Sequence, residues 1–268
     1  MLRLSVAAIV SLFSFNALAA DFTRADALFV KRADGAAATQ AARAAYDQLL
    51  PGLSNADLVY AVSRIGQLDI YAGDVLLPKS AKEERRAIFN RCFDDALLKI
   101  KPELVGETPQ FYYWRGTCLA FWAESASPIE RLMKVQDMKK MIAGGLALDR
   151  RYYGGGILRL AAGLYSNPMA RPVGLYNPDD ALVKVTEALA GAAYPGDAND
   201  GSSYYANARY KVETLRELNR KSEALELATT AIAEIEELTA AGALPIGIEP
   251  ETAFELGNLR VLKAALEQ

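Results

Sequence analysis

The sequence contains no histidine, and only two cysteines occur among its 268 residues. Without an imidazole, neither the Ser-His-Asp and Cys-His nucleophile arrangements nor most zinc sites can form. Carboxylate or lysine chemistry stays open in principle, but the sequence has no nucleophile motif and no close pair of carboxylates in a loop. We therefore expect a non-catalytic protein that uses no cofactor and no metal.

Long apolar runs and an excess of positive charge are also missing. After residue 19, no run reaches the roughly 18 continuous apolar residues that a membrane helix needs. The formal net charge is −3, which argues against a nucleic-acid-binding surface, because such surfaces carry clustered basic residues. Apolar residues make up 51% of the chain, enough to build a buried core and to argue against disorder.

The first 19 residues have the pattern of a secretory signal peptide. Arg3 precedes the apolar run SVAAIVSLFSF, and Ala17-Leu18-Ala19 matches the small-x-small pattern of a cleavage site. We expect cleavage after Ala19, which leaves residues 20–268 as a single helical domain, soluble in a bacterial periplasm. No cysteine lies near the cut, so we do not expect a lipid anchor.

Cys92 and Cys118 are the two cysteines of the chain. After export they would lie in an oxidising compartment, where disulfides form and persist. The sequence does not give the separation of the two Cα atoms, on which a disulfide depends. Two interpretations therefore stay open, a disulfide or two small apolar residues packed within helices.

Apolar residues recur at helical spacing along the mature chain, and no stretch alternates as a strand would. We therefore predict an all-α fold, in which the helices form pairs and a last helix closes the chain. The repetition indicates an α-solenoid of about five antiparallel helix pairs, in the manner of tetratricopeptide repeats. The pairs are expected at 21–50, 54–101, 109–149, 155–193 and 203–240.

Several polar residues are placed where they would begin helices. Thr23 and Ser80 are each followed three residues later by an acid, as in a capping box. Thr108, Ser127 and Asn177 each precede a proline, which suits the first position of a helix because its missing N–H has no partner there. These residues predict five helix N-termini.

The stretch 146–182 differs from the ordinary paired helices on either side of it. It contains three consecutive glycines, then a short apolar helix that carries Arg159, then a loop with Pro168, Pro172 and Pro178. A helical array needs no such loop in order to fold. We therefore look for the functional site in this stretch.

The glycine break and the arginine after it form the first candidate site. The glycines could expose backbone N–H groups at a helix start, where anions bind, and the arginine could pair with a carboxylate. Alternatively, glycine ends one helix and lets two helices approach closely, and this packing role is the one that we favour. The candidate residues here are Tyr153, Gly154, Gly155, Gly156 and Arg159.

A dense aromatic run in the helix expected at 109–125 gives a second group of candidates. Trp114, Cys118 and Phe121 share one helical face, and we expect them in the core. Tyr113 and Arg115 point in other directions. We therefore consider Tyr113 and Arg115 candidates for lining a groove.

Tyr165, Arg171 and Tyr176 lie on or beside the proline loop at 166–178. A loop of this length between helices is often functional. It could fold over the concave face as a lid or a partner contact, or it could be an insertion that faces solvent. The sequence leaves both open.

Parts of the chain also resemble two known families. Residues 218–232, LNRKSEALELATTAI, are similar to the turn and second helix of a tetratricopeptide repeat. The mature chain as a whole resembles the T component of TRAP (tripartite ATP-independent periplasmic) transporters. That resemblance rests on FYYWRGTCLAFWAES at 111–125, LDRRYYGGGILRLAAGLY at 148–165 and NPDDAL at 177–182.

The resemblance to the T component implies a helical protein with a groove or pore. It also implies a role in transport, in which the protein docks the transporter's periplasmic substrate-binding protein. Our own hypothesis adds that the protein passes or holds a small organic ligand. The alternative is a general tetratricopeptide scaffold that organises protein complexes of the cell envelope. A homo-oligomer stays open, and no nucleic-acid partner is expected.

Overall fold

The computed structural model describes residues 20–190, 205–244 and 249–268. Within these ranges the chain forms twelve α-helices joined by short 3-10 and π-helical turns, with no strand. The all-α prediction is therefore confirmed. The expected signal peptide, residues 1–19, lies outside the described residues.

Each of the five predicted ranges covers two helices wholly or in large part, and the short helix Pro102–Val105 lies between the second and third ranges. The first part of the chain contains α1 (Thr23–Val30), α2 (Ala36–Leu49), α3 (Asn55–Ile70), α4 (Lys82–Arg91), α5 (Pro102–Val105), α6 (Pro109–Ser125) and α7 (Pro128–Leu148). The second part contains α8 (Tyr152–Ser166), α9 (Pro178–Ala190), α10 (Tyr205–Glu217), α11 (Lys221–Ala240) and α12 (Glu249–Leu266). The range of α8 includes Tyr153, Gly154 and Gly155, whose φ and ψ are left-handed, so the right-handed helix is interrupted at the glycines as expected.

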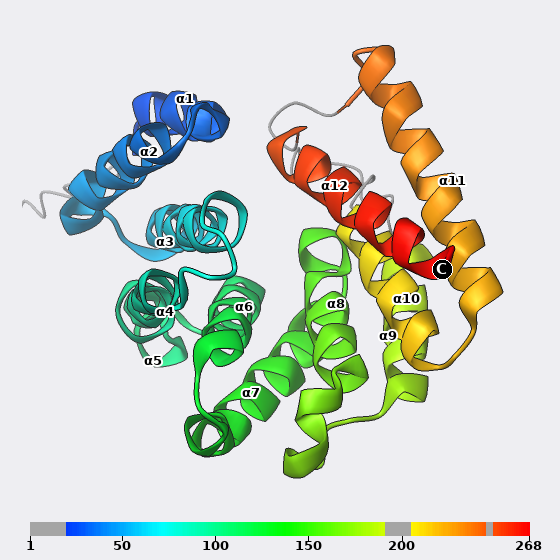
Figure 1. The fold of residues 1–268 in the computed structure, drawn as a ribbon. Coiled ribbons are helices and arrows are strands. Elements are labelled where there is room, and N and C mark those ends of the chain that lie inside the picture. The colour runs from blue at the N-terminus through cyan, green and yellow to red at the C-terminus, as the bar shows by residue number, and fades with distance from the viewer. Residues whose placement is uncertain (1–19, 191–204, 245–248) are drawn as a thin grey trace, which may run out of the picture.

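The helices are arranged around a ring (Figure 1). They follow one another from α1 to α11, and α12 lies between α11 and the N-terminal helices. Arg32, directly after α1, donates its Nε–H to Glu251 Oε1 of α12 at 3.0 Å and forms an ion pair with it. Because these residues are 219 positions apart, the pair joins the two ends of the helical array.

The largest hydrophobic cluster is built around α6, the aromatic helix. Trp114 and Cys118 of this helix are buried, and Phe121 stacks on Phe89 with ring centroids 5.3 Å apart. A disulfide joins Cys118 to Cys92, in the π-helical turn Cys92–Ala96 after α4, with the Cα atoms 6.0 Å apart. The α6 helix is thus held to the N-terminal half by both packing and a covalent link.

Three of the five expected helix caps are present. Thr108 accepts a hydrogen bond from the Phe111 N–H, and Ser127 forms a reciprocal capping box with Glu130. Asn177 Oδ1 accepts from the Asp180 N–H at 3.2 Å. These three predictions are confirmed.

The predictions for Thr23 and Ser80 are wrong. The α1 helix begins at Thr23 itself, and the α4 helix begins after Ala81, in both cases without a side-chain cap. Asp26, which we expected to complete the box with Thr23, instead accepts from the Tyr46 hydroxyl. A long-range hydrogen bond has replaced the local one at this position.

Candidate ligand-binding site

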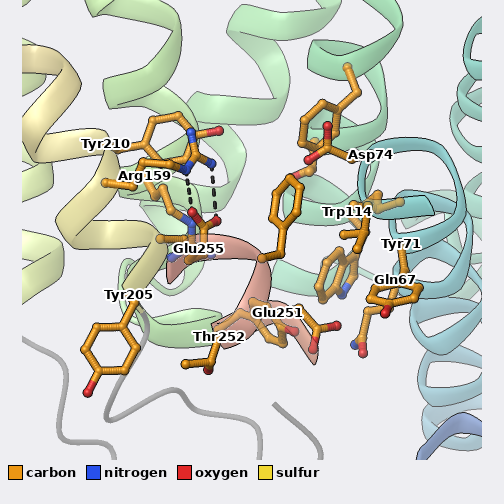
Figure 2. A pocket seen from close by; sticks show the side chains of 18 of the residues that line it. Gln67, Tyr71, Asp74, Trp114, Arg159, Tyr205, Tyr210, Glu251, Thr252 and Glu255 are labelled. Atoms are coloured by element: carbon orange, nitrogen blue, oxygen red, sulfur yellow. Dashed lines mark hydrogen bonds and ion pairs between the residues drawn. The ribbon is translucent and has the colours of Figure 1, made fainter. Parts of the chain in front are cut away.

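A cavity of about 110 Å³ lies between α3, α6, α8, α10 and α12. We call it the central cavity, and Figure 2 shows it from close by. Trp114 and Tyr71 face Arg159 and Tyr210 across it, and α12 contributes its floor in this view. Its aromatic residues are Tyr71, Tyr113, Trp114, Phe121, Tyr153, Tyr205, Tyr210 and Phe254. Its charged residues are Asp74, Arg159, Arg209, Glu251 and Glu255.

The glycine break gives α8 a left-handed kink beside this cavity. Tyr153, Gly154 and Gly155 have φ values of 54°, 59° and 73°. A Cβ on Gly155 would lie 2.9 Å from the Ala188 Cβ, and one on Gly156 would lie 2.6 Å from the Tyr113 ring. The glycines therefore allow both the kink and the close approach of α8 to α9 and α6.

The kink also places Tyr153 in an aromatic cluster. Its ring centroid lies 4.5 Å from that of Trp114, edge-on, and 5.5 Å from that of Tyr113. A non-glycine residue with positive φ costs on the order of 1 kcal/mol, which such aromatic contacts can offset. The left-handed conformation of Tyr153 thus builds one wall of the central cavity.

Arg159 is buried in the opposite wall, with 4% of its surface exposed. Its Nη1 donates to Asn207 Oδ1 at 2.7 Å, and its Nη2 donates to the Tyr113 hydroxyl at 2.8 Å. Asn207 Nδ2 in turn donates to the Gly154 carbonyl at 2.8 Å. These bonds tie α6, α8 and α10 together at the cavity.

The hydrogen bonds that the structure shows at Gly154 and Gly155 are made within the protein. The Gly154 carbonyl accepts from both Asn207 and Arg159, and the Gly155 N–H already donates to the Arg151 carbonyl at 3.0 Å. At the glycine break, the Gly154 carbonyl therefore accepts a hydrogen bond from Arg159. The sequence had suggested backbone N–H groups that donate to a ligand.

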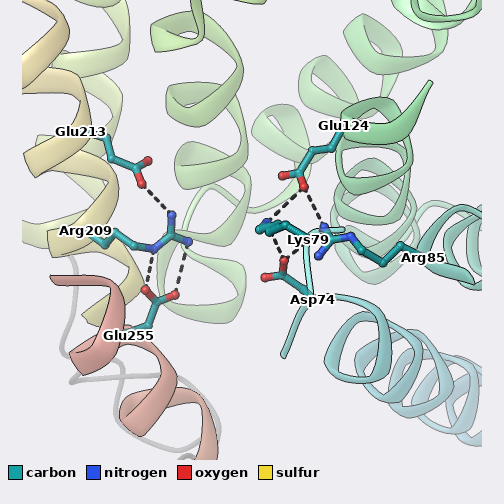
Figure 3. Close-up of polar contacts among 7 residues, drawn as sticks. All are labelled: Asp74, Lys79, Arg85, Glu124, Arg209, Glu213 and Glu255. Atoms are coloured by element: carbon teal, nitrogen blue, oxygen red, sulfur yellow. Dashed lines mark hydrogen bonds and ion pairs between the residues drawn. The ribbon is translucent and has the colours of Figure 1, made fainter. Parts of the chain in front are cut away.

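Two ion-pair clusters flank the cavity and face each other in Figure 3. On one side Arg209 pairs with both Glu213 and Glu255. Burial works against the charge of Arg209, but the two carboxylates hold the pKa of its guanidinium well above the ordinary value. On the other side the paired residues are Asp74, Lys79, Arg85 and Glu124.

Tyrosines in the cavity wall keep their protons well beyond neutral pH. Burial raises the pKa of Tyr210 to about 12, and burial likewise raises the pKa of Tyr71. Their hydroxyls are therefore neutral donors and acceptors, and the cavity offers a ligand aromatic faces with polar edges.

The structure brings together only some of the residues expected at the site. Tyr113, Tyr153 and Arg159 line the central cavity, although Tyr113 is buried and does not face an open groove. Trp114, expected only in the core, is buried and also lines the cavity. A residue can belong to the core and also line the cavity, because the cavity lies inside the core.

Arg115 and the proline-loop residues lie elsewhere. Arg115 Nε donates to the Phe93 carbonyl at 3.0 Å, and Arg115 does not line the central cavity. Tyr165 packs near Lys184, and the Arg171 guanidinium stacks on the Tyr176 ring at 4.3 Å. None of these lines the central cavity, so the loop is not its lid among the described residues.

The wall made by α10 and α12 was not predicted from the sequence. Tyr205 and Arg209 are four residues apart on α10, so they share one helical face with Tyr210 beside them. That local pattern was visible, but its position across from α6 was not. The missed residues that argue most for a site are Tyr205, Arg209, Tyr210, Phe254 and Glu255.

Comparisons with known proteins do not assign a function to this site. No protein-family model and no curated protein matches the chain. Among the helices of the described ranges, none is both long and apolar enough to cross a bilayer. The chemistry of the central cavity is therefore the basis of the functional proposal.

Proposed function

We propose that this protein is a non-catalytic accessory protein that holds a small organic ligand in its central cavity. The observation that supports the proposal is the closure of the helical ring around an aromatic cavity. Well-packed interiors leave few voids larger than a water molecule, whereas ligand sites are concave, mostly apolar and equipped with a few oriented polar groups. The central cavity has this composition.

The size of the cavity indicates a compact ligand. Apolar cavities of about 150 Å³ accept benzene, and the central cavity measures about 110 Å³. Asp74, Arg209 and Glu255 already belong to ion pairs. Their charges are therefore balanced within the protein, and the ligand does not need to be charged. The ligand that fits best is a largely apolar molecule of roughly six heavy atoms with one hydrogen-bonding group.

In the proposed biological setting, the protein is the T component of a TRAP-type transporter. It is exported to the periplasm by residues 1–19 and docks a substrate-binding protein. A disulfide between Cys92 and Cys118 suits an oxidising compartment. The pairing of helices, with Asn219 left-handed at φ 59° between α10 and α11, suits degenerate tetratricopeptide repeats in a solenoid.

Native mass spectrometry of the tagged chain, drawn gently from a periplasmic extract, tests this proposal. We expect a small ligand and a co-purified substrate-binding protein. Ala206→Leu is the matched variant, because Ala206 lines the cavity and a leucine side chain would fill it. It should lose the ligand and keep its helical circular dichroism. Absence of any ligand from the wild-type protein would contradict the proposal.

A general envelope scaffold is the second candidate function, and one observation favours it. Ile129, Leu132 and Met133 at the start of α7 are 73%, 59% and 70% exposed. Met169 is also exposed, and its sulfur accepts from Arg131 of α7 at 3.4 Å. If the protein is only a scaffold, Leu132→Ser with Met133→Ser will abolish partner capture, and the purified wild-type chain will carry no ligand.

A further inference from the structure

An exposed apolar patch lies at one edge of the helical ring. Its four large side chains come from the first two turns of α7 and from the 3-10 turn Pro168–Val173 after α8, and they are Ile129, Leu132, Met133 and Met169. The bond from Arg131 to the Met169 sulfur, at 3.4 Å, joins the two segments. Both segments lie at the lower edge of the view in Figure 1. We call these four residues the α7 patch.

The grouping of these residues distinguishes the α7 patch from ordinary exposed apolar residues. Single exposed apolar side chains are common on protein surfaces, whereas contiguous ones mark sites of contact with proteins or membranes. Val183 and Val261 are exposed to a similar extent, but among the described side chains each is the one large apolar residue exposed on its helix. In the α7 patch, three apolar residues are spaced by three and four positions, so they are neighbours on the surface of α7.

The segments around the patch carry an excess of positive charge. Residues 128–141 and 168–173 contain five lysines and arginines and two acids, although the whole chain has a net charge of −3. Both acids are already paired, Glu130 with Arg86 and Asp137 with Lys134. Within the described ranges, four basic residues of these segments form no ion pair with a carboxylate, and they are Arg131, Lys139, Lys140 and Arg171.

The positive charges and the apolar side chains are exposed on the same side of α7. Met133 and Lys140 are seven residues apart, which is two turns of helix, so they lie on one face and roughly 10 Å apart along the helix axis. Lys139 and Lys140 are both exposed. In the neighbouring 3-10 turn, Arg171 is exposed as well and stacks on the Tyr176 ring at 4.3 Å. The surface therefore has an apolar end beside a basic region.

An anionic lipid surface has the complementary chemistry. Peripheral membrane proteins bury apolar side chains roughly 5–10 Å deep, at the boundary between headgroups and acyl chains, while lysines and arginines contact the negative headgroups. The side chains of the α7 patch protrude from two adjacent turns, and a lipid layer accepts such side chains without a matching pocket.

From this complementarity of charge and apolar surface, we propose that the α7 patch docks the protein on an anionic phospholipid membrane surface. The apolar side chains enter the lipid, and the unpaired lysines and arginines contact the headgroups. The proposal does not depend on the ligand of the central cavity. It differs from the scaffold function, which gives the same patch to a protein partner.

Flotation with lipid vesicles tests the inference, with the chain that lacks residues 1–19, because their apolar run would itself bind lipid. One set of vesicles is phosphatidylcholine alone, and the other is an equal mixture of phosphatidylcholine and phosphatidylglycerol. We expect an affinity at least about tenfold higher for the anionic vesicles, and a loss of this preference at high salt, which screens the charges. A protein that floats with neither set of vesicles would overturn the inference, and so would equal affinity for both sets.

Two double variants assign the parts of the surface. Leu132→Ser with Met133→Ser should lower the affinity for anionic vesicles at least about tenfold, because these side chains no longer enter the lipid. Lys139→Gln with Lys140→Gln should keep the apolar contact and lose most of the preference for anionic vesicles. Unchanged binding by the serine variant would contradict the proposal.

Val183→Ser with Val261→Ser is the matched control, because it removes two similarly exposed apolar residues elsewhere on the molecule. It should bind vesicles as wild type does. Ala206→Leu should do the same, so loss of the cavity ligand and loss of membrane docking are distinguishable. If the wild-type protein ignores both sets of vesicles, but forms a dimer or captures a periplasmic protein through Leu132 and Met133, the patch is a protein interface and the inference is wrong.

Discussion

At the scale of single residues, the left-handed glycines of the structure give a matched pair of substitutions. Gly155 and Gly174 have φ values of 73° and 68°, so alanine is strained at either position by about 1 kcal/mol. Only at Gly155 would the new Cβ meet a neighbour, at 2.9 Å from the Ala188 Cβ. We predict that Gly155→Ala costs a further ~1–3 kcal/mol in the free energy of unfolding.

Urea denaturation of both variants measures this difference. Equal losses would show that α8 and α9 relax without cost, and that the glycine is needed only for its conformation.

The sequence marked Tyr113, Tyr153 and Arg159 as candidates in two separate groups, and it predicted neither that they meet nor what they do. Three consecutive glycines predict a break in the helix. The structure places Tyr113, Tyr153 and Arg159 at the central cavity. Whether Arg159 would meet a ligand or Asn207 depended on a helix 48 residues further along the chain. No local pattern carries that information.

At the scale of elements, the start of α7 provides a test of pH dependence. Glu130 completes the capping box with Ser127 and pairs with Arg86, and the bond to Arg86 is the main cause that lowers its pKa to about 2. A carboxylate with a lowered pKa in the folded state stabilises the protein above its ordinary pKa of 4.5 and loses that effect as the pH falls toward 2.

We therefore predict that Glu130→Gln melts at a lower temperature than wild type at pH 6, and that the gap closes between pH 4.5 and about 2. Differential scanning calorimetry across this range measures the gap. Glu226→Gln removes an exposed acid from α11 that makes no ion pair in the described structure, and it should show no such gap. A gap that stays constant with pH would contradict the role of Glu130.

The disulfide between α6 and the turn after α4 gives a second prediction at this scale. It closes a loop of 26 residues, which corresponds to about 3.5 kcal/mol of lost chain entropy in the unfolded state. The double variant Cys92→Ala with Cys118→Ala should lose approximately that free energy of unfolding. Reductant should have no effect on this variant, and a variant as stable as wild type would contradict the prediction.

The helices were predictable because the spacing of apolar residues and several capping residues indicate the same helical segments. Thr108, Ser127 and Asn177 cap as expected, since each is followed by a proline that fixes the first turn. At Thr23 and Ser80 no proline fixes the first turn, and α1 and α4 begin without a side-chain cap. At α1, the Asp21 carboxylate accepts the Thr23 N–H at 2.9 Å. The local sequence pattern therefore predicted where the helices lie better than it predicted the residue at which each helix begins.

At the scale of the whole molecule, the ion pair between Arg32 and Glu251 joins the two ends of the ring. Arg32 is 2% exposed, so Glu251→Gln would leave a buried cation with a weaker acceptor. We predict a loss of about 1–3 kcal/mol and faster hydrogen exchange in the first turns of α12.

Glu236→Gln is the control, because it breaks an exposed ion pair with Arg260 and should cost less than about 1 kcal/mol. Urea denaturation and hydrogen exchange followed by mass spectrometry measure both variants. Equal effects would show that the ring closes without this ion pair.

Ring closure is the feature of the molecule that could not be predicted from the sequence. Paired helices bury their faces on neighbours, and that rule predicts an array but not where its ends meet. The contact between Arg32 and Glu251 spans 219 positions and has no local signature. The wall of the central cavity that α10 and α12 supply therefore became visible only in three dimensions.

The central claim is that a small ligand occupies the central cavity, and the two tryptophans allow a direct measurement. Trp114 lines the cavity, whereas Trp122 packs edge-on against Phe93 away from it. In Trp122→Phe, the fluorescence of Trp114 should change when the small molecules released from the wild-type protein are returned to it. In Trp114→Phe, the fluorescence of Trp122 should not change. No response from Trp114, or an equal response from both tryptophans, would contradict the account.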